Sequence, residues 1–211
     1  MNFETSFGAT LPPWVSAELA DVPQSTASDE ERMALVHRLA ARNHVEGNGG
    51  PFAALVAERG TGRVVSVGVN VVLSSRLSAT HAEVTALSLA QVARGTWDLG
   101  AAQSPAHELV VNWRPCAMCY GATLWSGVTR LVVAGQGPEL EELTGFDEGP
   151  VRDDWDTAFA QRGIEVVQDV LRDEALAVFA AYGKTKALIY NGRGGGARPS
   201  LSAGPSDPVS A

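Results

Sequence analysis

Two short segments that lie far apart in this chain carry the residue types of a single metal site. His81-Ala82-Glu83 comes first, and Pro115-Cys116-Ala117-Met118-Cys119 follows about thirty residues later. One neutral imidazole and two thiolates are three ligands of a tetrahedral zinc, which leaves the fourth position for water. The chain is therefore expected to fold so that these two segments meet at one point.

Glu83 lies two residues after His81, so it can move protons without binding the metal. A His-x-Glu segment followed by Pro-Cys-x-x-Cys is the pattern of zinc-dependent base deaminases. In such a site zinc lowers the pKa of water to about 7, and the glutamate takes and returns protons. The sequence predicts that His81, Cys116 and Cys119 bind Zn²⁺ and that Glu83 is catalytic. The predicted reaction is hydrolytic removal of an amino group from a nitrogen heterocycle.

Each motif also has an ordinary explanation when it is taken alone. A His-x-Glu triplet is common by chance, and Cys-x-x-Cys between a strand and a helix is typical of thiol redox pairs, some of which carry a nearby tryptophan such as Trp113. A closed structural zinc, with Glu83 or another residue as fourth ligand, is a third alternative. The order of the motifs, the proline before Cys116 and the position of both motifs at predicted helix starts favour the catalytic zinc.

Charge and cysteine content restrict the classes of partner. The chain of 211 residues has 16 basic and 24 acidic side chains, a net charge of −8, which disfavours binding to a phosphate backbone. Its two cysteines are three positions apart, which suits a shared metal better than a disulfide and implies a reducing compartment. The first residues do not resemble a signal peptide, and no apolar run reaches the ~20 residues of a membrane helix. These features predict a soluble, cytoplasmic protein.

The pattern of apolar residues predicts one α/β domain between two irregular ends. Residues 1–28 form an N-terminal extension, 29–190 the domain, and 191–211, rich in Gly, Ser and Pro, a disordered tail. Helices are predicted at 29–45, 81–95, 117–126, 151–161 and 173–186, strands at 52–58, 63–70, 108–113, 128–134 and 164–170, and loops at 71–80 and 135–149. This order indicates a three-layer α/β/α sandwich around a central five-stranded mixed sheet, with the site where strands end and helices begin.

From about residue 30 to 190 the chain resembles the cytidine-deaminase-like superfamily of zinc-dependent deaminases. Within it, the chain is most similar to bacterial guanine deaminases and their nucleobase and nucleoside deaminase relatives. Besides the zinc motifs, the matching pieces are Gly50-Pro51-Phe52-Ala53-Ala54, Gly68-Val69-Asn70, Glu83-Val84-Thr85-Ala86 and Gly145-Phe146-Asp147-Glu148. The last two point to the guanine branch.

The resemblance implies roles for the matched positions. Asn70 would form a hydrogen bond to the base, and Phe52 and His81 would enclose its ring. Glu148 would accept hydrogen bonds from the ring N–H and amino edge, because a carboxylate accepts from two donors at once. The substrate contacts implied in addition are Ala54, Ala82, Trp113 and Tyr190, with Tyr182 as the alternative to Tyr190. Without the resemblance, Phe52 is typical of a core, Asn70 of a turn and Glu148 of a solvated acidic loop.

The resemblance also implies a homodimer in which the C-terminal segment, residues 172–190, crosses to cover the partner's active site. The expected substrate is guanine or a close analogue, such as a modified guanine, a triazine or a pterin. Alternatives are a nucleoside deaminase acting on guanosine, cytidine or adenosine, and a tRNA adenosine deaminase, which the net charge disfavours. Arg114 stands where the family usually has glutamate, which leaves the identity of the substrate open more than the type of reaction.

Overall fold

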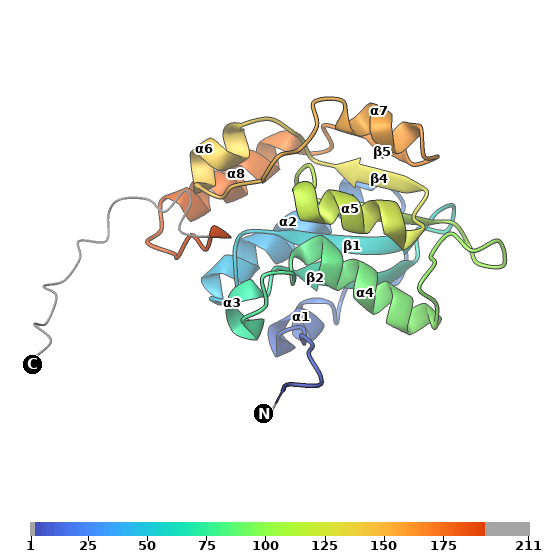
Figure 1. Ribbon diagram of the computed structural model, residues 1–211, viewed down its shortest axis with the longest axis horizontal. Helices are drawn as coiled ribbons and strands as arrows, with labels where there is room; N and C mark the ends of the chain where they lie inside the picture. The colour runs from blue at the N-terminus through green and yellow to red at the C-terminus, as the bar shows by residue number, and fades with distance from the viewer. Residues whose placement is uncertain (1–2, 193–211) are drawn as a thin grey trace, which may run out of the picture.

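A mixed five-stranded sheet forms the centre of the computed structural model, which describes residues 3–192 (Figure 1). The strands are β1 (Ala53–Glu58), β2 (Val64–Val69), β3 (His107–Val111), β4 (Arg130–Val133) and β5 (Glu165–Val167). Their order in the sheet is β2-β1-β3-β4-β5. β1 pairs antiparallel with β2 and β3, whereas β3, β4 and β5 run parallel. The predicted mixed sheet of five strands is confirmed.

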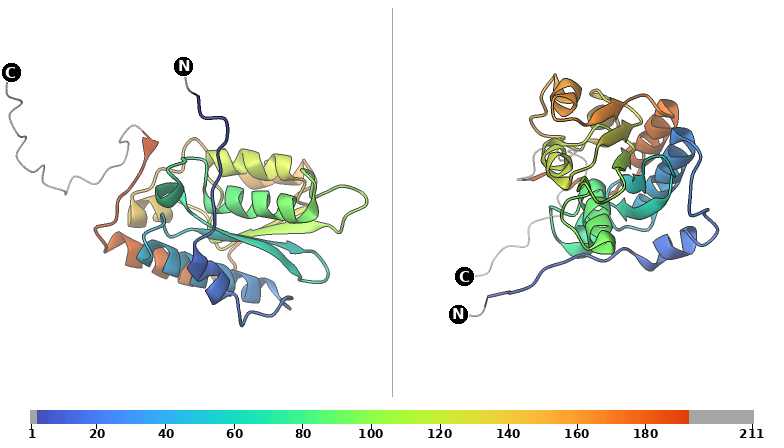
Figure 2. Two further views of the ribbon diagram at one scale, coloured as in Figure 1. Left: turned by 90° about the horizontal axis from the view of Figure 1, so that it is seen from below. Right: turned by 90° about the vertical axis from the view of Figure 1, so that its right-hand side faces the viewer.

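Helices cover both faces of this sheet, so the predicted three layers are present. Figure 2 shows α4 (Ala82–Arg94) and α5 (Ala117–Ser126) on one face, with α2 (Asp29–Val45) and α8 (Arg172–Gly183) on the other. The shorter helices are α1 (Pro13–Glu18), α3 (Val72–Ser75), α6 (Glu139–Thr144) and α7 (Trp155–Ala160). No helix in residues 3–192 has the length and apolar character required to span a bilayer.

Strand β1 divides the core into two halves because successive side chains of a strand point to opposite faces. Leu55 packs in a cluster with residues of α2 and α8, such as Leu39 and Phe179. Val56 belongs to a second cluster, with residues of α4 and α7 such as Phe159. Every residue of β1 is buried, and residues 53–57 form a continuous apolar run without alternation before Glu58.

A glycine sets the distance between β2 and α4. A Cβ placed on Gly68 would lie 2.2 Å from the carbonyl oxygen of Ala82 and 2.4 Å from the backbone nitrogen of Ala86. Any larger residue would therefore push the first turn of α4 away from the sheet. This close approach fixes the distance between the sheet and the start of α4, which carries His81 and Glu83.

Two short helices lie in segments that were expected to be loops. α3 lies within 71–80, and α6 lies within 135–149, where Leu140 is fully buried and Gly145 ends the helix with a φ of 83°. Helices of four and six residues are too short to show a helical apolar period, so the sequence pattern did not reveal them. Of the tail predicted to be disordered, residues 193–211 lie outside the described residues.

A buried ion network fastens α2 to the sheet at the end remote from the zinc motifs. Asp29 contacts Arg32 at 2.7 Å and Arg130 at 2.6 Å, and Glu108 contacts the same two arginines at 3.0 and 2.7 Å. Hydrogen bonds from Arg130 and then Arg32 outweigh burial and lower the pKa of Asp29 from 3.8 to about 2. A carboxyl whose pKa is depressed on folding stabilises the fold above its unfolded pKa, and this contribution is lost as pH falls through the folded value.

We expect Asp29→Asn to cost about 1 kcal/mol of unfolding free energy at pH 6, allowing for solvent screening of this partly exposed group. The difference from the wild type should shrink as pH falls from about 4 to about 2, because the wild-type carboxyl is then also neutral. Urea unfolding at pH 6, 4, 3 and 2.5 measures it. Asp153→Asn, at an exposed position outside the network, is the matched control. A difference independent of pH would contradict the assignment.

Candidate active site

The zinc motifs meet where two helices on the same face of the sheet begin. His81 is the N-cap of α4, and Cys116, which follows Pro115 in the chain, is the N-cap of α5. Both caps have extended backbone angles, so the chain turns sharply into each helix. Cys119 follows one helical turn after Cys116 and is fully buried. The fold thus brings together the three predicted ligands, as the sequence required.

The donor set fits zinc. One ligand atom each of His81, Cys116 and Cys119 lies within 4.8 Å of the others. The Cys116 Sγ and His81 Nδ1 atoms are 3.4 Å apart, close to the roughly 3.5 Å expected between ligand atoms on one tetrahedral zinc. Two thiols and an imidazole also match the ligand preference of zinc. These three are the only group of histidine, cysteine and acidic residues in 3–192 with metal-site geometry.

Contacts among the three ligands shift their pKa values. Hydrogen bonds from Cys119 and then His81 lower the pKa of the Cys116 thiol to about 4. The pKa of Cys119 is raised well above its usual 9.0 by its contact with Cys116 and by burial. Burial lowers the pKa of His81, but its contact with Cys116 and the charge of Glu83 outweigh burial and leave that pKa raised. One thiolate is therefore already favoured, and a divalent cation would favour the second.

Glu83 lies in the first turn of α4 next to the ligands and is buried, with 6% of its surface exposed. Burial raises its pKa above 4.5, and the negative charge of Cys116 adds to this effect. A carboxyl with a raised pKa holds a proton more readily than an ordinary glutamate, as a group that both accepts and returns a proton requires. The structure thus places Glu83 where a general acid and base would be required, and its catalytic role remains a prediction.

A cavity of about 330 Å³ opens beside these residues. Of the predicted site residues, eight line it: Phe52, Asn70, His81, Glu83, Trp113, Cys116, Glu148 and Tyr190. Cys119 lies beneath it, whereas Ala54 and Ala82 are fully buried in β1 and at the start of α4 and do not line it. Arg114 is the only lysine or arginine among the described lining residues.

Glu148 reaches the cavity from the segment after α6. The backbone N–H of Ala117 donates to its carbonyl oxygen at 3.0 Å, which ties this segment to the first turn of α5. Its side-chain oxygens have no hydrogen-bond or ion-pair partner among residues 3–192. Burial raises its pKa well above 4.5, the charges of Cys116 and Glu83 act in the same direction, and the charge of Arg114 opposes them. The carboxyl is thus buried, lines the cavity and is available to a ligand.

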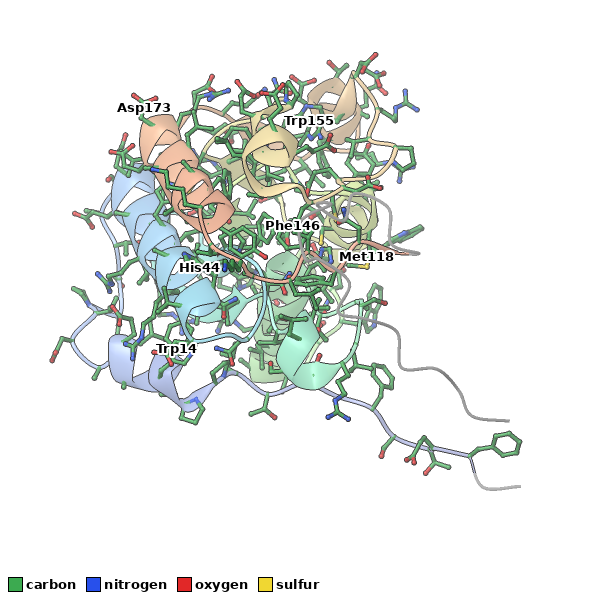
Figure 3. All side chains as sticks on the ribbon, turned by 90° about the vertical axis from the view of Figure 1, so that its left-hand side faces the viewer. Trp14, His44, Met118, Phe146, Trp155 and Asp173 are labelled. Carbon is green, nitrogen blue, oxygen red and sulfur yellow. The ribbon has the colours of Figure 1, made fainter. Side chains whose placement is uncertain are left out.

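An aromatic wall closes one side of the cavity. The rings of Phe52 and Phe146 meet edge to face at 5.4 Å, and Phe146 also contacts Tyr190 at 4.9 Å and stacks on Tyr182 at 5.5 Å. Phe146 and Met118, both labelled in Figure 3, line the cavity. Phe146 belongs to a matching motif of the sequence but had no predicted role, because its partners come from distant segments.

A second residue without a predicted role, Asn43, holds Asn70 in place. Its side-chain N–H groups donate to the carbonyl oxygens of Gly50 at 2.9 Å and Asn70 at 2.8 Å. Asn43 is fully buried near the end of α2. The sequence signal for the role of Asn43 was its polar side chain on the buried face of a predicted helix, because a buried polar group needs a hydrogen-bond partner.

Comparison with known proteins identifies the family. Residues 26–135 match the family model described as the cytidine and deoxycytidylate deaminase zinc-binding region. The chain belongs to this family. The deaminase is also 32% identical to guanine deaminase of Bacillus subtilis over 136 aligned residues. The aligned region covers 64% of this chain and 81% of that protein. The deaminase is accordingly a zinc-dependent hydrolase that acts on amidine C–N bonds.

Solved structures extend the similarity over most of the described fold. The deaminase is 40% identical to a structure of guanine deaminase from Nitrosomonas europaea, with a TM-score of 0.80 over 88% of this chain and all of that one. It is 43% identical to a protein named NE0047 in complex with 2,6-diaminopurine, with a TM-score of 0.80 over 89% of this chain and 98% of that chain. The three-layer fold and the reaction class predicted from the sequence are thereby confirmed.

Proposed function

We propose that this deaminase converts guanine or a close analogue to the corresponding oxo-heterocycle and ammonia, with water as co-substrate. The observation that carries the proposal is the carboxyl of Glu148. It lines the cavity, its oxygens are free to accept hydrogen bonds, and the charges of Cys116 and Glu83 raise its pKa. In its ionised form this carboxyl accepts from two neighbouring N–H groups, and guanine presents a ring N–H next to its amino group. The guanine deaminases among its relatives support the same substrate class.

In the proposed reaction Glu83 moves the protons. His81, Cys116 and Cys119 would hold the zinc, which would supply a Lewis acid that makes water a nucleophile at neutral pH. Glu83 takes a proton from this water as its oxygen attacks the carbon that bears the amino group, and it passes the proton to the adjacent ring nitrogen. Glu83 then carries the second proton of water to the amino group, so that ammonia leaves as the carbonyl forms. Its raised pKa suits both halves of this cycle.

The cavity residues orient the base for that attack. Phe52 presents a ring from the segment before β1, and Phe146 packs edge to face against this ring. Asn70 contributes an amide at the end of β2, and Glu148 accepts at the opposite edge of the base. A site built around hydrogen bonds rejects bases that lack the matching groups, because its buried polar atoms are then left without partners.

A substrate panel tests the proposal by ammonia release from the zinc-loaded protein. We expect kcat/KM for guanine to exceed that for adenine and cytosine at least about a hundredfold, because these bases offer Glu148 a ring acceptor where guanine has N–H. Guanosine, adenosine, cytidine, a triazine amine and a pterin complete the panel, and guanosine should be at least about tenfold poorer than guanine. Fastest turnover of a nucleoside, or of an adenosine in a tRNA stem-loop, would overturn the substrate assignment.

A homodimer in a reducing, cytoplasmic compartment is part of the proposal. In the single chain, the predicted crossing segment ends at Tyr190, which lines the cavity of its own chain, as do Asn191 and Gly192 that follow it. A crossed dimer would place the same segment over the neighbouring cavity, so the arrangement stays a prediction. Light scattering of the purified protein measures the oligomeric state, and a mass of one chain, 22.1 kDa, would contradict the dimer.

A further inference from the structure

We propose that Tyr190 is a positioning residue whose hydroxyl fixes the orientation of the Asn70 side-chain amide. In this orientation Asn70 presents only its N–H donors to the substrate. The substrate therefore has to offer a hydrogen-bond acceptor at this position. The inference deepens the proposed function, because it rests on Asn70 contacting the base. It assigns Tyr190 a task distinct from contact with the substrate.

Backbone donors fix the direction of every hydrogen bond in this arrangement. The N–H of Val72 lies 3.2 Å from one side-chain atom of Asn70, and because a backbone N–H can only donate, that atom is the oxygen Oδ1. The N–H of Gly50 donates to the hydroxyl oxygen of Tyr190 at 2.7 Å. That hydroxyl therefore points its own proton elsewhere, and Asn70 Oδ1 lies 2.7 Å away to accept it.

Both hydrogen bonds to the side-chain amide of Asn70 thus go to its oxygen. Oδ1 accepts from the Tyr190 hydroxyl and from the Val72 N–H, whereas Nδ2 has no hydrogen-bond partner among residues 3–192. Asn70 is only 1% exposed and lines the cavity, so its free N–H groups have little other than a ligand to bind. Bonds arranged in series also strengthen one another in a buried site. A flip of the amide would break two hydrogen bonds and set Nδ2 against two donors.

Packing holds Tyr190 in the position that this role requires. Its ring contacts Phe146 with a centroid separation of 4.9 Å. The next residue, Asn191, donates to the carbonyl oxygen of Gly145 at 2.9 Å and accepts from the N–H of Asp147 at 3.0 Å. The segment that carries the hydroxyl is therefore fastened on both sides of the cavity.

Tyr190→Phe keeps the ring and removes only the donor. We expect kcat/KM for the best substrate of the panel to fall roughly tenfold, the effect of one hydrogen bond. Tyr120→Phe is the matched control, because that ring packs on Phe159 at 4.5 Å and does not line the cavity. Its kcat/KM should stay within about twofold of the wild type.

A double-mutant cycle separates positioning from direct contact with the substrate. Asn70→Asp keeps both acceptor contacts and loses the N–H donors, so it should itself lower kcat/KM roughly a hundredfold. Adding Tyr190→Phe to Asn70→Asp should then change kcat/KM less than about twofold, because no amide is left to orient. A further tenfold loss in the double variant would overturn the positioning role and favour a direct contact between Tyr190 and the base.

A readout without substrate distinguishes failure of this inference from failure of the proposed function. In ¹⁵N spectra of the zinc-loaded protein, the side-chain amide signals of Asn70 should move in Tyr190→Phe and stay in place in Tyr120→Phe. Unmoved signals in both variants would overturn the hydrogen bond whatever the enzyme deaminates. Moved signals without guanine turnover would keep Tyr190 as the residue that orients Asn70 and reject guanine alone.

Discussion

Glu83→Gln is expected to keep zinc and to lose turnover. The amide has nearly the shape of the carboxyl but cannot take a proton from water or return one to the leaving amine, so kcat should fall at least about a thousandfold. KM should change little, because the residues expected to hold the base are untouched. The variant should fold normally, since a buried carboxyl with a raised pKa is replaced by a neutral group of the same size. Single-turnover ammonia release and metal analysis of the same sample measure both quantities.

The matched control is Glu142→Gln, an exposed glutamate on α6. It removes the same charge from the chain and should keep both zinc and turnover. If Glu83→Gln lost both zinc and activity, Glu83 would be a metal ligand. The alternative of a closed structural zinc site would then be favoured. Turnover within tenfold of the wild type would remove Glu83 from the mechanism.

The sequence revealed those features that depend on local patterns or on ligand chemistry. Helix α2 was predictable to its first residue because Ser28 accepts from the N–H of Glu31 at its start. The zinc trio was predictable because few chemistries require one imidazole and two thiols in this order. A five-stranded sheet followed from short apolar runs separated by turn residues, although the runs did not give the strand order β2-β1-β3-β4-β5.

Features that arise from tertiary contact could not be predicted in the same way. Phe146 is an ordinary loop residue until the chain brings it to the cavity, and Asn43 is an ordinary helix residue until it meets the backbone of Gly50 and Asn70. The hydrogen bond between Tyr190 and Asn70 joins residues 120 positions apart, and no local pattern encodes such a separation. The short helix α6, in turn, depends on burial of Leu140 more than on its own propensity.

Cys119→Ala is expected to abolish both zinc binding and activity. Cys119 is fully buried beside the other two ligands, and an alanine in its place offers no donor atom to the metal. With two ligands left, zinc should fall well below one ion per chain, and turnover should drop by at least about a thousandfold, because the Lewis acid is lost. Since zinc binds the folded state only, its loss should also lower the melting temperature. Metal analysis, ammonia release and thermal unfolding test the three consequences on one preparation.

Removal and return of the metal separates loss of zinc from damage to the fold. A chelator should inactivate the wild type, and added zinc should restore it, whereas Cys119→Ala should gain nothing from zinc. Trp125→Ala, which removes an exposed side chain at the far end of the same helix, should keep the metal and the activity. Chelator-treated wild type that still released ammonia would be incompatible with a metal-dependent hydrolase. Wild-type protein purified without zinc but with a Cys116–Cys119 disulfide would instead favour a thiol redox pair, because two free thiolates are required to bind the ion.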